Sequence, residues 1–307
     1  MSEFIGVDVG GTKTAAVLID DAGQLLDRIQ VQTPKEPERF IDAAANAVER
    51  LRTDRLAGAG VGLAGLVRWP EGVFAWGPHV PGTNVPAREM LTQRLNVPII
   101  VDNDANLTAY AEATAGAGRG HDHILLVTLG TGIGAAVVTQ GSIYRGASFA
   151  GEFGHMTMVQ GGPLCACGRR GCWETLASGP ALARLAREAV ALEPRSAFAR
   201  RHPEPTSENV IEAVRDRDPT AYALVEQVGR AFGLGISNLV TAFDPDVVIV
   251  GGGLGTVGES LIEPARRTLQ ENLHGAPHRI APPLVVAELG RDAGAMGGAL
   301  LAKDTLE

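Results

Sequence analysis

DVGGTKT, residues Asp8–Thr14, separates two short apolar segments and sets the pattern of the whole chain. The segments Phe4–Val9 and Thr14–Ile19 have the length and composition of β-strands, and the glycine pair between them marks a tight turn. A segment of the same design, TLGTGIG at Thr128–Gly134, joins a second pair of apolar segments. The sequence therefore predicts an α/β protein with a weak internal repeat, whose two halves meet near Gly116–His123.

The bulk composition narrows the class of protein. The chain has 307 residues, 45% of them hydrophobic and 20% charged, which suits a globular protein of two domains. The formal net charge is -8 and no basic run stands out, so we expect no nucleic-acid partner. The chain has no apolar stretch of about 18 residues and no leader-like start, so we expect no membrane span and a cytoplasmic protein.

Two further expectations concern segments away from the glycine turns. The proline- and arginine-rich segment Glu193–Pro205 is expected to be an exposed linker between helices. Five histidines are expected to lie on the surface: His121, His123, His202, His274 and His278.

The first glycine turn has the chemistry of a phosphate site. The backbone amides of Gly10 and Gly11 can approach phosphate oxygens without a side chain in the way, and Thr12 and Lys13 add a hydroxyl and a charge. Asp8, at the end of the preceding strand, can hold magnesium. An ordinary hairpin turn is an equal alternative for this segment alone. The spacing is not that of a Walker loop.

Two later segments strengthen the phosphate interpretation. Thr131 and Gly132 offer a second hydroxyl and amide, so the two turns together predict a nucleoside triphosphate in a cleft between the halves. GGGLG at Gly251–Gly255 follows an apolar strand, and Gly252 and Gly253 there allow close packing against an adenine or ribose face. A dinucleotide fingerprint does not fit, because the required strand–helix context is missing.

VDNDAN, residues Val101–Asn106, places short polar side chains where a strand ends and a helix begins. Capping of the helix needs only one of them. Asp104 is our candidate general base, which would accept the proton of an attacking sugar hydroxyl, and Asn103 would orient neighbouring hydroxyls.

All three cysteines of the chain lie in CACGRRGC, as Cys165, Cys167 and Cys172, and His155 stands upstream in GEFGH. Three thiolates and one imidazole make a closed tetrahedral set for structural zinc. The alternative is three unrelated buried thiols. Glu152, His155 and Glu174 flank the knuckle and suit hydrogen bonding to vicinal hydroxyls, although either glutamate alone could be a solvated surface carboxylate.

These motifs together resemble those of the ROK family of sugar kinases, and most closely its bacterial ATP-dependent glucokinases. The matching segments are DVGGTKT, VDNDAN, LGTGIGAA, GEFGH, CACGRRGCWE and GGGLG. The resemblance implies an actin-like fold of two ribonuclease-H-like domains with a cleft between them. We expect a small domain at 1–118, completed by a C-terminal helix at 291–307, and a large domain with the zinc knuckle at 119–290.

The resemblance also implies roles for residues. Asp104 would be the catalytic base, zinc would bind His155 and the three cysteines, and magnesium-ATP would bind the two glycine turns and GGGLG. Sugar contacts would come from Gly65, Asn103, Glu152, His155 and Glu174. The family implies a homodimer or homotetramer.

One stretch departs from the family pattern. Many glucokinases of the family carry a PNLxGW-like loop, whereas this chain has HVPGTNVP at His79–Pro86, with Asn84 but no tryptophan. Glucose is the expected hexose, and Asn84 an expected contact. Mannose, fructose or an N-acetylhexosamine remains an alternative, as does polyphosphate as donor. A sugar-responsive ROK repressor is the non-enzyme alternative, disfavoured by the acidic charge and by the seven residues ahead of Asp8.

Overall fold

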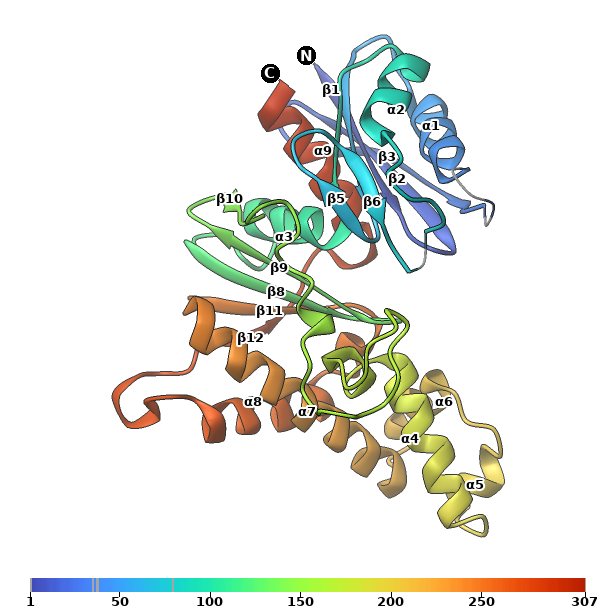
Figure 1. Cartoon of the computed structure of the whole chain (residues 1–307), viewed down its shortest axis with the longest axis vertical. Coiled ribbons are helices and arrows are strands. Elements are labelled where there is room, and N and C mark those ends of the chain that lie inside the picture. The colour runs from blue at the N-terminus through green and yellow to red at the C-terminus, as the bar shows by residue number, and fades with distance from the viewer. Residues whose placement is uncertain (1, 35, 37–38, 79, 307) are drawn as a thin grey trace. The chain divides into compact units, whose positions relative to one another are not determined.

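The computed structural model describes residues 2–34, 36, 39–78 and 80–306 (Figure 1). By compactness the chain divides into two units. The first comprises Met1–Leu126, Ala136–Gly151 and Ala287–Glu307, and the second comprises Val127–Ala135 and Glu152–Val286. The domain limits expected from the sequence, at residues 118 and 290, remain a prediction. Within the described residues, no helix combines the length and the apolar character that a membrane span requires.

The first unit is built on a five-stranded mixed sheet with the order β3-β2-β1-β4-β7. Its strands are β1 (Glu3–Val9), β2 (Lys13–Asp20), β3 (Leu25–Gln32), β4 (Leu56–Leu63) and β7 (Ile99–Asn103). Strands β1, β4 and β7 run parallel, and the register places Asp8 beside Gly62 and Gly62 beside Asp102. The polar residues therefore gather where the parallel strands end, which is where α/β sheets commonly bind ligands.

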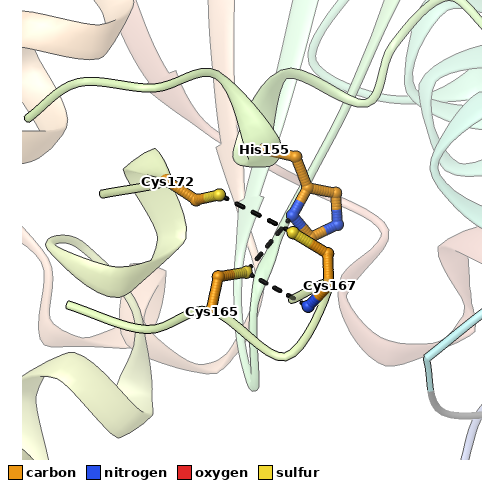
Figure 2. Close-up of side chains that lie close together, drawn as sticks. All are labelled: His155, Cys165, Cys167 and Cys172. Carbon is orange, nitrogen blue, oxygen red and sulfur yellow. Dashed lines mark hydrogen bonds between the residues drawn. The ribbon is translucent and has the colours of Figure 1, made fainter. Parts of the chain in front are cut away.

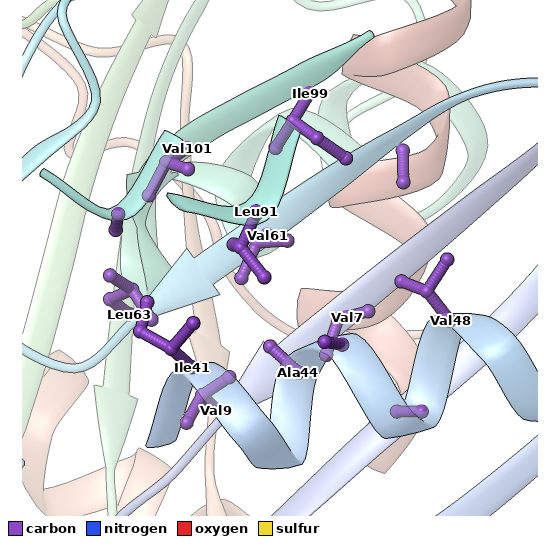
Figure 3. Close-up of a cluster of buried hydrophobic side chains, with 14 of the residues drawn as sticks. Val7, Val9, Ile41, Ala44, Val48, Val61, Leu63, Leu91, Ile99 and Val101 are labelled. Atoms are coloured by element: carbon purple, nitrogen blue, oxygen red, sulfur yellow. The ribbon is translucent and has the colours of Figure 1, made fainter. Parts of the chain in front are cut away.

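Helices cover both faces of this sheet, which explains why β1 is buried along nearly its whole length. These helices are α1 (Phe40–Leu51), α2 (Ala87–Leu95), α3 (Asp104–Ala115) and α9 (Ala293–Leu306). Side chains of α1 such as Ile41 and Val48 pack with Val7, Val61 and other residues of the sheet in a buried cluster (Figure 3).

Helix α9 lies against β1 and β4 because Gly6 and Gly60 of these strands leave room for it (Figure 1). A Cβ atom at Gly6 would lie 1.7 Å from the carbonyl oxygen of Ala295, and one at Gly60 would lie 2.0 Å from that of Gly298. The backbone of the last helix thus touches the backbone of the central strands. No side chain larger than hydrogen fits at these contacts.

The second sheet repeats the strand order of the first, as β10-β9-β8-β11-β12. Its strands are β8 (His123–Leu129), β9 (Ile133–Thr139), β10 (Ser142–Ile143), β11 (Val247–Gly251) and β12 (Leu284–Val286). In each sheet the strands on either side of a glycine turn are neighbours, and a parallel pair follows on the other side. The weak internal repeat predicted from the two turns is therefore confirmed.

The helices of the second unit are α4 (Gly179–Leu192), α5 (Ala197–Arg201), α6 (Ser207–Arg215), α7 (Pro219–Phe243) and α8 (Glu259–Asn272). Trp173 is fully buried and stacks on Phe232 of α7, with 5.6 Å between ring centroids. Gly235 makes this packing possible, since a Cβ there would lie 2.0 Å from the indole ring.

Two expectations about this unit were wrong. The segment Glu193–Pro205 is not simply an exposed linker, because it contains α5, whose Phe198 side chain is buried. His202 is also buried, with its ring 5.2 Å from that of Phe198. The arginines of the segment suggested exposure, but Phe198 and Ala199 between them form a short apolar face that is buried in the second unit.

The sequence analysis also missed a hairpin of the first unit, formed by β5 (Leu66–Arg68) and β6 (Val73–Trp76). Each strand is too short to show a period, and the intervening Trp69–Gly72 carries a proline and a charge.

Candidate active site

Two acidic side chains of the first unit share the edge of the sheet where the parallel strands end. Asp8 lies near the end of β1, and Asp104 is the first residue of α3, directly after β7. Burial raises the pKa of Asp8 to about 7, and the charge of nearby Asp104 adds to the increase. A pair of carboxylates held in this way favours a bound cation or a shared proton between them.

The polar residues of VDNDAN divide their roles. Asn103 caps α3, because its side-chain oxygen accepts the backbone N–H groups of Ala105 at 2.8 Å and Asn106 at 3.1 Å. Its amide nitrogen donates to the carbonyl oxygen of Gly65 at 3.0 Å. Asp104 stands in the first turn of α3, at the positive end of the helix dipole. The structure thus brings together Gly65, Asn103 and the neighbouring Asp104.

Asp102 is the more buried of the two carboxylates in the motif, and the sequence analysis did not predict its partner. Its side chain is 2% exposed and pairs with Arg145, whose Nε donates to Asp102 Oδ2 at 2.8 Å. A buried carboxylate in an apolar strand signals that a cation must lie nearby. The sequence does not say which of its 27 basic residues that is, because Arg145 lies 43 positions away.

Asn84 also belongs to the first unit, with a left-handed backbone at φ 53°. Its side-chain oxygen accepts a hydrogen bond from Arg68 Nη2 at 2.9 Å. His79, at the start of the same loop, lies outside the described residues. In the first glycine turn, the Gly10 N–H donates to the Lys13 carbonyl at 3.0 Å, and Thr12 and Lys13 are exposed.

The second unit contains a cavity of about 590 Å³ beside its own glycine turns. Thr131 of the GTGIG turn and Gly253 of GGGLG both line it, so the structure brings these two predicted segments together. The size falls in the range of small-molecule sites.

The rest of the cavity wall comes from residues that the sequence analysis missed. The N-terminal turns of α4 and α6 contribute Gly179, Pro180, Ser207 and Glu208, and Arg187 lies further along α4. The sequence carries the helix-start signals, since Ser178 caps α4 and Thr206 forms a capping box on α6. Nothing local shows that both helices begin at the same cavity.

The predicted metal ligands lie close together in the second unit (Figure 2). One ligand atom from each of His155, Cys165, Cys167 and Cys172 lies within 4.8 Å of all the others. Cys167 Sγ and Cys172 Sγ are 3.7 Å apart, and Cys165 Sγ is 3.5 Å from His155 Nδ1. Zinc–sulfur bonds of about 2.3 Å give tetrahedral edges of roughly 3.8 Å, so the donor set fits zinc.

The carboxylates beside this cluster are those predicted to contact sugar. Glu174 Oε1 lies 3.6 Å from His155 Nδ1 and accepts a hydrogen bond from the Cys165 thiol at 2.8 Å. Glu152 Oε2 lies 3.9 Å from Nε2, the other ring nitrogen. Gly132 abuts Glu174, because a Cβ there would lie 2.5 Å from Oε2. His155 can therefore turn Nδ1 to a metal and Nε2 toward a ligand.

We expect zinc to hold the Phe153–Trp173 region in shape. Replacing Cys172 with alanine removes one of four ligands, so bound zinc should fall from about one per chain to a small fraction, and the melting temperature should drop by several degrees. Elemental analysis and thermal unfolding check both effects. His278→Ala, at an exposed histidine, is the matched control. Active wild-type protein that contains no zinc would contradict the prediction.

The raised pKa of Asp8 predicts a pH-dependent stability in metal-free buffer. The folded state holds the Asp8 proton up to about pH 7, whereas the unfolded state releases it near pH 3.8. The bound proton therefore contributes in full to the free energy of unfolding below pH 4, and this contribution is lost as pH rises through 7. Asp8→Asn carries no carboxylate to ionise, so it avoids this loss. Between pH 4 and pH 8, its free energy of unfolding should increase relative to that of the wild type by up to about 4 kcal/mol.

Urea unfolding in EDTA at a series of pH values measures this difference. Asp54→Asn, at an exposed aspartate, should follow the wild type. If Asp8→Asn kept a constant offset from the wild type at all pH values, the carboxylate would not be desolvated as described.

Comparison with known proteins gives one consistent family. Residues 4–305 match the ROK family. The chain is 37% identical over 312 residues to a glucokinase of Streptomyces coelicolor, covering 99% of this chain and 98% of that protein. It is 32% identical over 306 residues to an N-acetylmannosamine kinase of Shigella flexneri, covering 98% of each.

Among solved structures, the ROK family glucokinase of Streptomyces griseus in complex with glucose and AMPPNP matches with a TM-score of 0.90. The two are 36% identical, and the match covers 99% of this chain and 100% of that one. The expected α/β, actin-like sugar kinase fold is thereby confirmed. The chain belongs to the ROK family.

Proposed function

We propose that this protein is an ATP-dependent sugar kinase that transfers the γ-phosphoryl group of ATP to the 6-hydroxyl of glucose. The observation that carries the proposal is the grouping of Glu152, His155 and Glu174 around a zinc-type ligand set, which suits binding of vicinal hydroxyls. Full-length similarity to a glucokinase, and to a glucokinase structure that contains glucose and AMPPNP, supports it.

Asp104 is the proposed general base. It stands at the start of α3, and capping by Asn103 fixes the turn that carries it. It would accept the proton of the sugar hydroxyl as that oxygen attacks phosphorus. Gly65, Asn84 and Asn103 are proposed sugar contacts from the same unit.

Each unit has proposed nucleotide contacts of its own. The cavity would take the nucleoside, against Thr131, Gly253 and the starts of α4 and α6. Gly132 and Gly252 would border it, and Gly10, Gly11, Thr12 and Lys13 would meet phosphate oxygens. Asp8 would hold magnesium, which neutralises charge on the phosphates when bound.

Zinc in this proposal has no catalytic step. With three thiolates and one imidazole the ion is fully coordinated, so no position is open for water. The bound ion and its ligands would fix the positions of Glu152, His155 and Glu174 so that they can contact the sugar. Assembly as a homodimer or homotetramer, and a cytoplasmic location, remain predictions.

Asp104→Asn tests the proposed base. The amide cannot accept the proton, so kcat should fall by about three decades or more, while the dissociation constant for glucose should change little. Steady-state kinetics and calorimetric sugar titration measure the two quantities separately. Glu188→Gln, at an exposed glutamate on α4, is the control and should leave both unchanged. Near-normal turnover by Asp104→Asn would remove Asp104 from this role.

The hexose is tested by an ADP-release assay with glucose, mannose, fructose, N-acetylglucosamine and N-acetylmannosamine. We expect kcat/KM for glucose to exceed that for each of the others by at least about tenfold, because a pocket built to bind hydroxyls leaves polar groups unpaired with a poorer substrate. N-acetylmannosamine is included because one full-length relative is a kinase named for that sugar. The assay is repeated with polyphosphate as donor. A higher kcat/KM for any other sugar would reject glucose as the substrate.

A further inference from the structure

Arg145 has two partners in the first unit that none of the proposed catalytic roles uses. Its guanidinium pairs with the buried Asp102 and also lies over the ring of Trp69, 3.9 Å from the centroid. The Arg145 side chain is only 15% exposed. An arginine this well enclosed, paired and stacked, is held in one orientation, unlike the exposed ion pairs of the helices.

The carboxylate of Asp102 connects this arginine to the start of α3. Its Oδ1 atom accepts the backbone N–H of Asn103 at 2.7 Å and the side-chain amide of Asn106 at 2.9 Å. Its Oδ2 atom accepts Nε of Arg145 at 2.8 Å. One oxygen therefore holds the residues on either side of Asp104, and the other holds Arg145.

The segment that carries Arg145 is itself anchored. The Arg145 carbonyl accepts the backbone N–H groups of Ser148 at 2.9 Å and Ala150 at 3.1 Å. The Ser148 hydroxyl accepts the Trp69 N–H at 3.2 Å and donates to the Trp69 carbonyl at 3.3 Å. This segment runs directly into Glu152, a proposed sugar contact.

We propose that Arg145 is a positioning residue for Asp104, acting through Asp102. The inference rests on the proposed role of Asp104 as general base. With Arg145 in place, the negative charge of Asp102 is balanced by the guanidinium, and both carboxylate oxygens have fixed hydrogen-bond partners. Without Arg145, a charge that is almost fully buried loses its counter-ion and must move toward water. That movement would withdraw Oδ1 from Asn103 and Asn106 and displace the first turn of α3.

This mechanism predicts that the effect of losing Arg145 depends on the charge at position 102. When Arg145→Met is added to Asp102→Asn, the side-chain oxygen at position 102 can still accept from Asn103 and Asn106, and no unpaired charge is left. Displacements of about 1 Å at a reacting group cost on the order of a hundredfold in rate. The two substitutions should therefore not act independently.

The test is a double-substitution cycle with kcat as the readout. Arg145→Met alone should lower kcat about 10²-fold, and Asp102→Asn alone about tenfold. Adding Arg145→Met to Asp102→Asn should change kcat less than about threefold. The glucose dissociation constant should rise by a smaller factor than kcat falls in every variant, because the proposed contact that is displaced is Asn103, whereas His155 and Glu174 keep their partners. A loss of folded protein alone would not produce this pattern in kcat per folded molecule.

Two further variants complete the cycle. Arg230→Met breaks an exposed ion pair with Glu226 and should leave kcat unchanged. If Arg145→Met does not fold, the same cycle is run with Arg145→Lys, which keeps the charge but loses the planar contact with Trp69. The effects of Arg145→Lys and Asp102→Asn on kcat should then be non-additive in the same direction, but by a smaller factor.

Effects that simply multiply across the cycle would overturn the inference. If Asp104→Asn is inactive while the effects multiply, the proposed base stands and only the role of Arg145 is lost. If Asp104→Asn turns over normally, the proposed base fails, and the link from Arg145 to Asp104 fails with it, whatever the cycle shows. Inactive Asp104→Asn together with strong coupling supports both.

Discussion

Burial of carboxylates at the ends of parallel strands is the constraint on which the first unit depends. The register aligns the partly exposed Asp8 and the buried Asp102 on either side of Gly62, at the end of a sheet that helices cover. Each carboxylate needs a different remedy. The charge of Asp102 is balanced by Arg145. Asp8 instead has a raised pKa, and a bound cation would stabilise its ionised form. The difference separates a structural acid from one that is suited to bind metal.

In the second unit, a cluster of cysteine sulfur and histidine nitrogen atoms lies in a segment with little regular secondary structure. The segment between Phe153 and Trp173 has little helix or strand, and four potential metal-ligand atoms lie there within 4.8 Å of one another. Glu174 belongs to the same knot of contacts through Cys165 and His155. Glu174, a proposed sugar contact, is thereby tied to the proposed metal ligands.

Most of the secondary structure and the main site segments could be predicted from the sequence because their signals are local. The spacing of the cysteines indicates a metal site, and the polar run at Asp102–Asp104 marks a strand end. What escaped prediction is the long-range pairing of Arg145, the arrival of α4 and α6 at one cavity, and the burial of His202. These depend on which residues meet after folding, and a single sequence does not record that.

The close contact of α9 with Gly6 and Gly60 has a consequence for biosynthesis. The sheet of the first unit is made early on the ribosome, but the helix that lies on one of its faces is encoded by the last residues of the family match. Until that helix emerges, the nascent chain exposes an apolar surface over β1 and β4. The first unit therefore cannot complete its packing on this face of the sheet before α9 has been synthesised.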